Sequence, residues 1–432
     1  MKCFFLLGII FIPIVTSFAQ SPTPTPTRPR VIIVGSPSGT PNPVFTPSPT
    51  PRNVVVVTTQ TPRPMASPTP YIFTSSTPIP TPTPRPTPLL NSYKYMTYGQ
   101  IKSKMQQAKS LMQTRPMPTS MTSGFLVTDV VRVAFNDWKT NEIDFVSMTK
   151  SVFLERNLEY PTVSSNGKNI IVKIIRANGV NTPVIIMDND NKPHTPIIVQ
   201  YPIERNGSLS EMAYYTSTHP GIVTPEVINA GKLYVRNTID AARDTLQKKG
   251  IFIQPIVADM AEKLCAVEHV DHARFKNEYH LNVYNDIFTL FALNEGNTYR
   301  YSVSSAGAGG MVQMIPSTYF MVRSRYYSVG LIPDFVEGMR NHQNAAQVML
   351  LYMQMTWDDL ISRETIATAL DNGVAFPDEL MSAGYNSNPA KLAGYIKRGG
   401  SNWRNLIPRE TKIYLQINAS LKRYISYPPR VK

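Results

Sequence analysis

Cysteine is nearly absent from this chain. Its 432 residues include two cysteines, Cys3 and Cys265. Cys3 falls in a short N-terminal segment that we expect to be removed, which leaves Cys265 alone and without an internal disulfide. A disulfide-rich scaffold is therefore excluded, and packing must stabilise the fold, as a chain of this length allows. Cys265 stands among apolar residues, which is typical of a buried thiol rather than of a nucleophile.

Metal-ligand clusters are also scarce. His269, Asp271 and His272 lie close together in the sequence, but no second cluster completes a ligand set. We therefore expect neither a metal site nor a cofactor.

Hydrophobic runs long enough to span a bilayer are missing. The run from Phe4 to Val15 is shorter than the roughly 20 residues that a spanning helix needs. It follows Lys2 and precedes Ser17-Phe18-Ala19, and this is the pattern of a cleaved signal peptide. Residues 1–19 are thus predicted to be a signal peptide. The mature protein is predicted to be exported, periplasmic or cell-wall associated, with no stable membrane span.

Acidic residues are outnumbered. The chain has 43 Lys and Arg against 29 Asp and Glu, a formal net charge of +14. Basic surfaces attract polyanions, which for an exported protein are the cell wall and anionic lipid. Nucleic acid is not expected as a partner, because no nucleic-acid-binding motif is present.

Proline, in contrast, is abundant and concentrated. The chain has 38 prolines, and residues 20–92 form a Pro/Thr/Ser-rich tract with alternating prolines. Such a sequence lacks backbone donors and favours extended polyproline II structure. We predict a disordered linker, which acts as a semi-stiff spacer.

Residues 93–224 predict a β-rich accessory module. A helical pattern at Met96–Met112 is followed by apolar segments that Asn-Gly and Asp/Asn-rich turns separate. The predicted strands are Val127–Phe135, Ile143–Leu154, Ile170–Ile175, Thr182–Met187 and Thr195–Tyr201. No motif in this module carries chemistry. It is expected to brace the catalytic part, with binding of a partner or glycan as the alternative.

Helical periodicity begins at Pro225 and continues towards the C-terminus, so residues 225–432 are predicted to form a mostly α-helical domain. The predicted helices are Glu226–Lys249, a segment around Ile256–Cys265, residues 278–294, Asn344–Trp357 and Arg409–Tyr424. The predicted fold class is therefore α+β.

A segment of small residues, from Glu295 to Tyr319, carries the strongest functional signal. Its sequence resembles the soluble lytic transglycosylase (SLT) domain family of the lysozyme-like superfamily. That family has the pattern Ser-x-Ala-Gly-Ala-x-Gly-Leu-Met-Gln, followed by Met-Pro-x-Thr. The residues in register are Ser304, Ala306, Gly307, Ala308, Gly310, Gln313, Pro316 and Thr318. Further matches occur at residues 383–386 and 409–414, so the resemblance covers about residues 250–424.

The resemblance implies a lysozyme-like catalytic domain that cleaves the MurNAc–GlcNAc bond of peptidoglycan and leaves 1,6-anhydro-MurNAc ends. One glutamate acts first as general acid and then as general base. Ser304, Gln313, Tyr385 and Asn386 match residues beside the acid and along the substrate cleft. Glu410 and Tyr414 match the closing helix. Glycan strands, and other cell-wall proteins as further candidates, are the expected partners.

Two residues are candidates for the acid, which should end a helix whose apolar face surrounds it. Glu295 extends an apolar row of residues 284–291 and keeps the family's spacing to Ser304 and Gln313. Glu268 extends the row of Ile256, Met260 and Leu264, but it requires an inserted helix at 278–294. We expect Glu295 by spacing alone, and Glu268 stays open.

Two other functions are compatible with the same residues. The first is a peptidoglycan-binding or scaffolding protein without catalysis. The second is a hydrolytic lysozyme, in which water attacks in place of the sugar hydroxyl.

Overall fold

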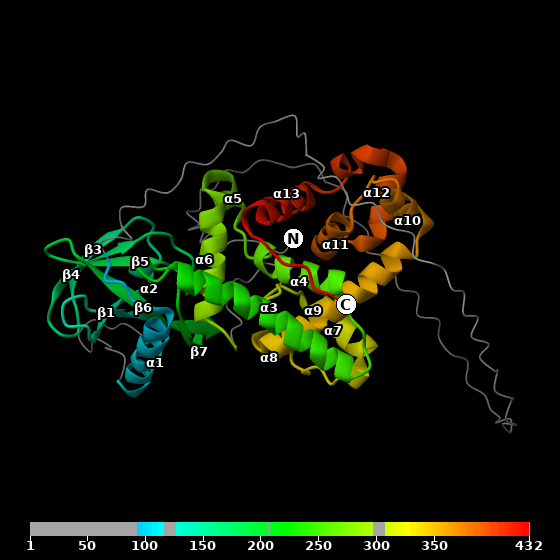
Figure 1. Ribbon diagram of the computed structural model, residues 1–432. Coiled ribbons are helices and arrows are strands. Elements are labelled where there is room, and N and C mark those ends of the chain that lie inside the picture. Colours follow the sequence, from blue (N-terminus) through cyan, green and yellow to red (C-terminus); the bar gives the residue numbers. More distant parts are fainter. Residues whose placement is uncertain (1–92, 116–126, 206, 297–306, 432) are drawn as a thin grey trace, which may run out of the picture. The chain divides into compact units, whose positions relative to one another are not determined.

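The computed structural model describes residues 93–115, 127–205, 207–296 and 307–431. The chain divides into two compact units, and one of them, Gly8–Pro80, lies wholly outside these residues. The predictions for the signal peptide, for the Pro/Thr/Ser-rich linker and for Ser304 also fall outside. The other unit contains all of the described residues, and it mixes helices with one antiparallel sheet (Figure 1).

The sheet is antiparallel, and its hydrogen-bonded order is β2-β1-β6-β5-β4-β3, with β7 paired to β6. Its strands are β1 (Val130–Asn136), β2 (Ile143–Thr149), β3 (Glu159–Val163), β4 (Asn169–Ile174), β5 (Val184–Asp188), β6 (Pro193–Arg205) and β7 (Ser208–Tyr215). A helix, α1 (Tyr98–Thr114), precedes the sheet, and the short helix α2 (Lys150–Phe153) follows β2.

Strand β1 is buried along its whole length because both faces of the sheet are covered there. Val131, Val133 and Phe135 belong to one apolar cluster with residues of β2, β4 and β5. Ala134 faces the other way, into a cluster that includes Ile101 and Met105 of α1. A strand covered on both faces reads as a nearly continuous apolar run, which is why the sequence predicted it.

The other predicted strands are also present, although some details differ. The strand predicted from Val127 starts at Val130, because Val127–Asp129 form a 3-10 turn. The segment predicted as one strand from Ile143 to Leu154 ends as a strand at Thr149, whose side chain accepts a hydrogen bond from the Val152 N–H and caps α2. Strands β3 and β7 were not predicted, because their polar residues and Pro161 disfavour a strand by composition.

Eleven further α-helices follow the sheet in the described chain, joined by loops and 3-10 turns. They are α3 (Pro225–Lys248), α4 (Pro255–Val267), α5 (His272–Asn277), α6 (His280–Leu293), α7 (Pro316–Arg325), α8 (Phe335–Arg340), α9 (His342–Ile361), α10 (Glu364–Asp371), α11 (Pro377–Asn386), α12 (Leu392–Gly399) and α13 (Arg409–Tyr424). Helix α3 begins as predicted, with Pro225 in its first turn and the Thr224 side chain accepting a hydrogen bond from the Val227 N–H. Within the described ranges, no helix is long and apolar enough to cross a membrane.

The sheet and the helices share a buried boundary. Ala292 and Leu293, at the end of α6, belong to the same apolar cluster as residues of α1 and the sheet. Beside them, the Asn294 amide donates to the Thr216 carbonyl (2.8 Å) and accepts from the Thr216 N–H (2.9 Å). Arg340 of α8 pairs with Glu211 of β7 at 3.0 Å. The β-rich segment therefore packs directly against the helical segment, an arrangement that suits a bracing element.

Candidate active site

Glu268 lies at the C-terminal end of α4. Its backbone N–H donates to the Leu264 carbonyl at 2.9 Å, which closes the last helical turn. The apolar rows of α4 continue to this point, and nearly every residue of its last two turns is buried. As a result, the Glu268 side chain is fully buried, with an exposed fraction of 0%.

Tyr414 of α13 contacts this buried carboxyl group. Its hydroxyl donates a hydrogen bond to Glu268 Oε1 at 2.8 Å, and both residues are buried. Tyr385 of α11 lies close by. Burial raises the pKa of Tyr385 well above its ordinary value, and the negative charge of Glu268 adds to that shift. Three helices, α4, α11 and α13, therefore converge on one carboxyl group.

Glu295 occupies a different setting from the one predicted. Helix α6 ends at Leu293, and Asn294 leaves helical geometry to bind Thr216. The Glu295 side chain then reaches the surface, where 38% of it is exposed, and it pairs with Lys102 of α1 at 2.8 Å. The expectation that the apolar row of α6 continues into a buried acid at Glu295 is wrong. The expectation rested on the number of residues between Glu295 and the later motif, and that number does not reveal that the helix ends before Glu295.

The Glu295 carboxylate also influences Tyr98 of α1. The pKa of Tyr98 is raised to about 12, mainly by burial and further by the charge of Glu295. The carboxylate thus contributes to a local contact between α1 and the end of α6. Of the two candidates, Glu268 is the one whose carboxyl group is buried. The segment between Glu268 and the small-residue turn contains α5 and α6, as this second candidate required.

Residues 309–314 form a tight turn that contains Gln313, and it is closed by the Gly309 N–H, which donates to the Met314 carbonyl. The Gln313 backbone has φ of +48°, its side chain is fully buried, and its Nε2 donates to the Gly310 carbonyl at 2.9 Å. Gly310 itself has φ of +72°, and a Cβ there would lie 2.5 Å from the Met339 carbonyl oxygen. Glycine is therefore required at this position. The Gln313 amide braces the turn from inside.

Two hydrogen bonds join this turn to residues that lie near the buried Glu268. The first joins His269, next to Glu268, to the Met311 carbonyl at 2.9 Å through Nε2. Since a carbonyl can only accept, Nε2 carries the proton; burial lowers the pKa of His269 to about 4 and keeps the ring neutral near pH 7. The second joins the Tyr385 hydroxyl to the Val312 carbonyl at 2.8 Å.

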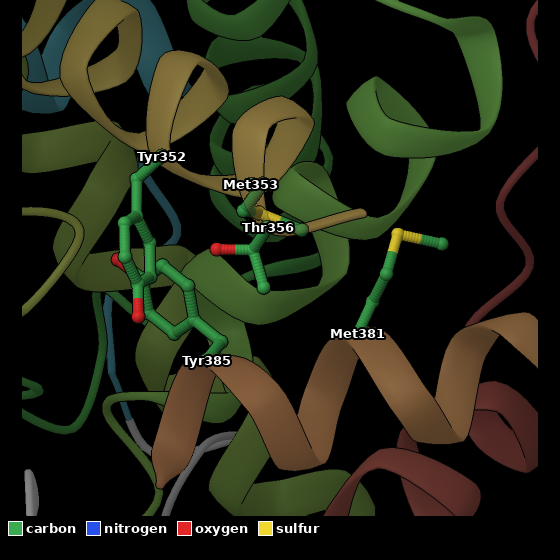
Figure 2. A pocket seen from close by; sticks show the side chains of 5 residues that line it. All are labelled: Tyr352, Met353, Thr356, Met381 and Tyr385. Carbon is green, nitrogen blue, oxygen red and sulfur yellow. The ribbon is translucent and has the colours of Figure 1, made fainter. Parts of the chain in front are cut away.

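Tyr385 and Asn386 lie side by side at the end of α11, as the sequence pattern required, but they have different partners. The Thr411 hydroxyl of α13 donates to Asn386 Oδ1 at 3.0 Å. Tyr385 packs edge to face against Tyr352 of α9, with ring centroids 5.8 Å apart. The two rings line a small hollow between α9 and α11, together with Met353, Thr356 and Met381 (Figure 2).

The structure thus brings Glu268, Gln313, Tyr385 and Asn386 into one region, leaves Glu295 at the surface beside α1, and does not describe Ser304. The sequence placed Tyr414 on the closing helix, but it did not predict that Tyr414 contacts the acid. Sequence reasoning considered His269 only as a metal ligand, and it did not single out Thr411. The position of His269 directly after a candidate acid was a signal that could have drawn attention to it.

No metal centre is found among the residues that the structure describes, since no group of three His, Cys, Asp or Glu side chains could hold an ion there. His269 binds a backbone carbonyl, whereas Asp271 caps α5 by accepting from the N–H groups of Ala273 (2.7 Å) and Arg274 (3.0 Å). Cys265 is buried, and burial raises the pKa of its thiol, so it is not set up as a nucleophile.

Comparisons with protein-family models, with curated proteins and with solved structures gave no match to this chain.

Proposed function

We propose that this protein is a peptidoglycan lytic transglycosylase, that its helical part is a lysozyme-like domain, and that Glu268 is its general acid and then its general base. The observation that carries the proposal is the fully buried Glu268 carboxyl group, hydrogen-bonded to Tyr414 at the end of α4. Burial against apolar side chains favours the neutral form of a carboxylic acid, and the reaction needs that form at the start.

The proposed reaction has two steps. Glu268 gives its proton to the glycosidic oxygen as that bond breaks, and the N-acetyl group of the substrate stabilises the positive sugar centre. The Glu268 carboxylate then takes the proton of the C6 hydroxyl, and the C6 oxygen closes on the anomeric carbon. The product is a 1,6-anhydro sugar, and no water is consumed. The second carboxylate of ordinary glycosidases is not needed in this scheme.

Positioning around the acid supports this assignment. Tyr414 holds one carboxylate oxygen, and the bond from His269 to Met311 fixes the backbone that follows the acid against the small-residue turn. Tyr385 and Asn386 form the adjoining wall. In the proposal, the β-rich part braces the helical part, and export through the signal peptide delivers the enzyme to the cell wall.

The test is mass spectrometry of the fragments that the purified protein releases from sacculi. Anhydro-muropeptides are expected from the wild type. Glu268→Gln, which keeps size and hydrogen bonding, should lose on the order of 10²–10⁴-fold in rate. Glu295→Gln is the matched control and should stay within about twofold of wild type.

Each alternative gives a different result. Reducing-end products with added water identify a hydrolytic lysozyme, and a complete lack of turnover with retained sacculus binding identifies a non-catalytic wall protein. Loss of activity in Glu295→Gln with retention in Glu268→Gln would reverse the assignment of the acid.

A further inference from the structure

Helix α12 presents a narrow face of two cations around an aromatic ring. Lys391, which directly precedes the helix, is followed at helical spacing by Tyr395 and Arg398, so the three lie on one face. Leu392 and Ile396 occupy another face and are buried. Lys391 and Arg398 are exposed, and Tyr395 is half-buried. We call the set Lys391, Tyr395 and Arg398 the α12 stripe.

The Arg398 side chain is held along this face. Its guanidinium carbon lies 5.3 Å from the centroid of the Tyr395 ring. It folds back over Gly394, where an added Cβ would stand only 3.4 Å from Arg398 Nη1. A cation over a ring is favoured by the charge distribution of the ring. The guanidinium therefore occupies a defined place without the help of a carboxylate.

Neither cation of the stripe is neutralised by an acidic side chain among the described residues. Other cations nearby are paired: Arg363 with Asp359 at 2.6 Å, and Arg404 with Glu379. The local composition is also one-sided. Six basic residues fall between positions 391 and 412, and Glu410 is the one acidic residue there. The stripe is thus a positive surface that is open to an external anion.

The stripe begins five residues after Asn386, a residue of the candidate active site. Asn386, at the end of α11, is bonded to Thr411, which lies one turn before Tyr414 on α13. From Asn386 the chain continues into the 3-10 turn Pro389–Lys391, and the Asn388 side chain caps this turn by accepting from the Ala390 N–H at 3.0 Å. Helix α11 is the neighbour of both α12 and α13 in the helical part (Figure 1).

We propose that the α12 stripe binds the free carboxylates on the peptide side chains of the glycan substrate. This inference rests on the proposed function. Peptidoglycan differs from neutral glycans in that its peptides carry carboxylates at intervals along the strand. An ammonium and a guanidinium on one helix face suit such groups, because Arg and Lys pair with carboxylates by charge-assisted hydrogen bonds. The stripe would thereby select peptide-bearing strands over uncharged ones.

The test compares two forms of one substrate. Fluorescently end-labelled glycan strands with acetylated amines are used before and after conversion of their carboxylates to methylamides. Binding is measured by anisotropy in the Glu268→Gln protein, so that cleavage does not interfere, and cleavage is measured in the otherwise wild-type chain. We expect the carboxylate form to bind about tenfold more tightly at low salt, with the difference shrinking at high salt.

Substitution of the two cations measures how much of the affinity difference depends on the α12 stripe. Lys391→Gln combined with Arg398→Gln should reduce the ratio of the two affinities to about one. Lys248→Gln combined with Arg325→Gln removes the same charge from exposed positions on α3 and α7, and this control should keep the tenfold ratio.

Three outcomes overturn the inference: equal affinity for both strands in the parent protein, an unchanged ratio in the stripe variant, or an equal loss in the control. Failure of the proposed function looks different, because the wild-type chain would then cleave neither strand while the binding ratio still decides the role of the stripe.

Discussion

At the scale of single residues, the bond between Tyr414 and Glu268 joins two buried polar groups that lie 146 positions apart. A buried hydroxyl or carboxyl group without a partner costs about 1–3 kcal/mol, so each group makes the burial of the other tolerable. Glu295 does not bear this desolvation cost, because its carboxylate reaches solvent and pairs with Lys102. In the proposed function, the buried setting is the one that suits proton transfer, whereas Glu295 makes a surface contact.

The first prediction concerns Tyr414. Tyr414→Phe keeps the ring and removes the donor to Glu268, and it should lower kcat about tenfold with little change in KM. Because a donor to a carboxylate favours its charged form, the alkaline limb of the pH–rate profile should also move to higher pH in the variant.

Tyr424→Phe offers a comparison on the same helix. Its ring packs edge to face against Tyr279, with centroids 5.5 Å apart, away from the acid. Rate measurements between pH 4 and 9 on both variants test whether Tyr414 positions the acid. An unshifted profile in Tyr414→Phe would contradict the role of Tyr414 in positioning the acid.

At the scale of elements, the turn before α7 is an internally braced unit between the acid and α11. Gln313 bonds back to Gly310, and the neighbouring carbonyls of Met311 and Val312 accept from His269 and Tyr385. The turn is therefore held by one hydrogen bond within it and by two hydrogen bonds to neighbouring segments. This arrangement holds the turn beside His269, the residue that follows Glu268, and the close approach of the Met339 carbonyl explains why Gly310 must be small.

The second prediction tests this brace. Gln313→Ala removes a fully buried amide and should cost about 1–3 kcal/mol of unfolding free energy, because the Gly310 carbonyl loses its donor. Gln106→Ala, at an exposed position of α1, is the control and should leave the melting temperature nearly unchanged.

Chemical denaturation of both variants, with cleavage normalised to folded protein, separates two roles of Gln313. A large loss of stability with normal cleavage per folded molecule supports the brace. Normal stability with weak cleavage would instead make Gln313 a sugar contact, as the family resemblance implies.

At the scale of the whole molecule, a buried connection links the sheet to the helices. Residues 216–219, between β7 and α3, are all buried. His219 is fully buried there, and its Nδ1 accepts a hydrogen bond from the Val184 N–H of β5 at 3.1 Å. Burial lowers the pKa of His219 to about 3. The joint between the two parts therefore contains a histidine that is neutral in the folded chain.

The third prediction is a pH dependence of stability. The unfolded chain protonates this histidine below about pH 6.5, whereas the folded chain does so only near pH 3. Between these values the unfolded state binds more protons. The contribution of His219 is therefore complete above about pH 6.5 and is lost as pH falls towards 3, by at most about 1.4 kcal/mol per pH unit.

His219→Asn removes the titration while its Oδ1 can still accept from Val184. Unfolding free energies measured from pH 7 to pH 4 should fall less steeply in the variant. The difference in slope should correspond to at most one proton, which is about 1.4 kcal/mol per pH unit. Equal slopes in the two proteins would show that His219 does not control the acid sensitivity of this joint.

The sequence alone determined much of the local structure. Helix α13 has the predicted bounds, α3 begins within one residue of its predicted start, and β1, β4, β5 and β6 lie where alternating or continuous apolar runs predicted them. These features follow from local periodicity, from proline positions and from capping side chains, which act over a few residues. The mixed α+β class follows from them.

Only the tertiary structure decided which glutamate is buried. Both candidates follow apolar helices, but Asn294 turns the chain outward before Glu295, whereas the Tyr414 hydroxyl of α13 donates a hydrogen bond to Glu268. Strands β3 and β7 likewise exist because neighbouring strands supply their hydrogen bonds, not because their own residues favour them. Such contacts join distant parts of the chain, and local sequence patterns do not contain them.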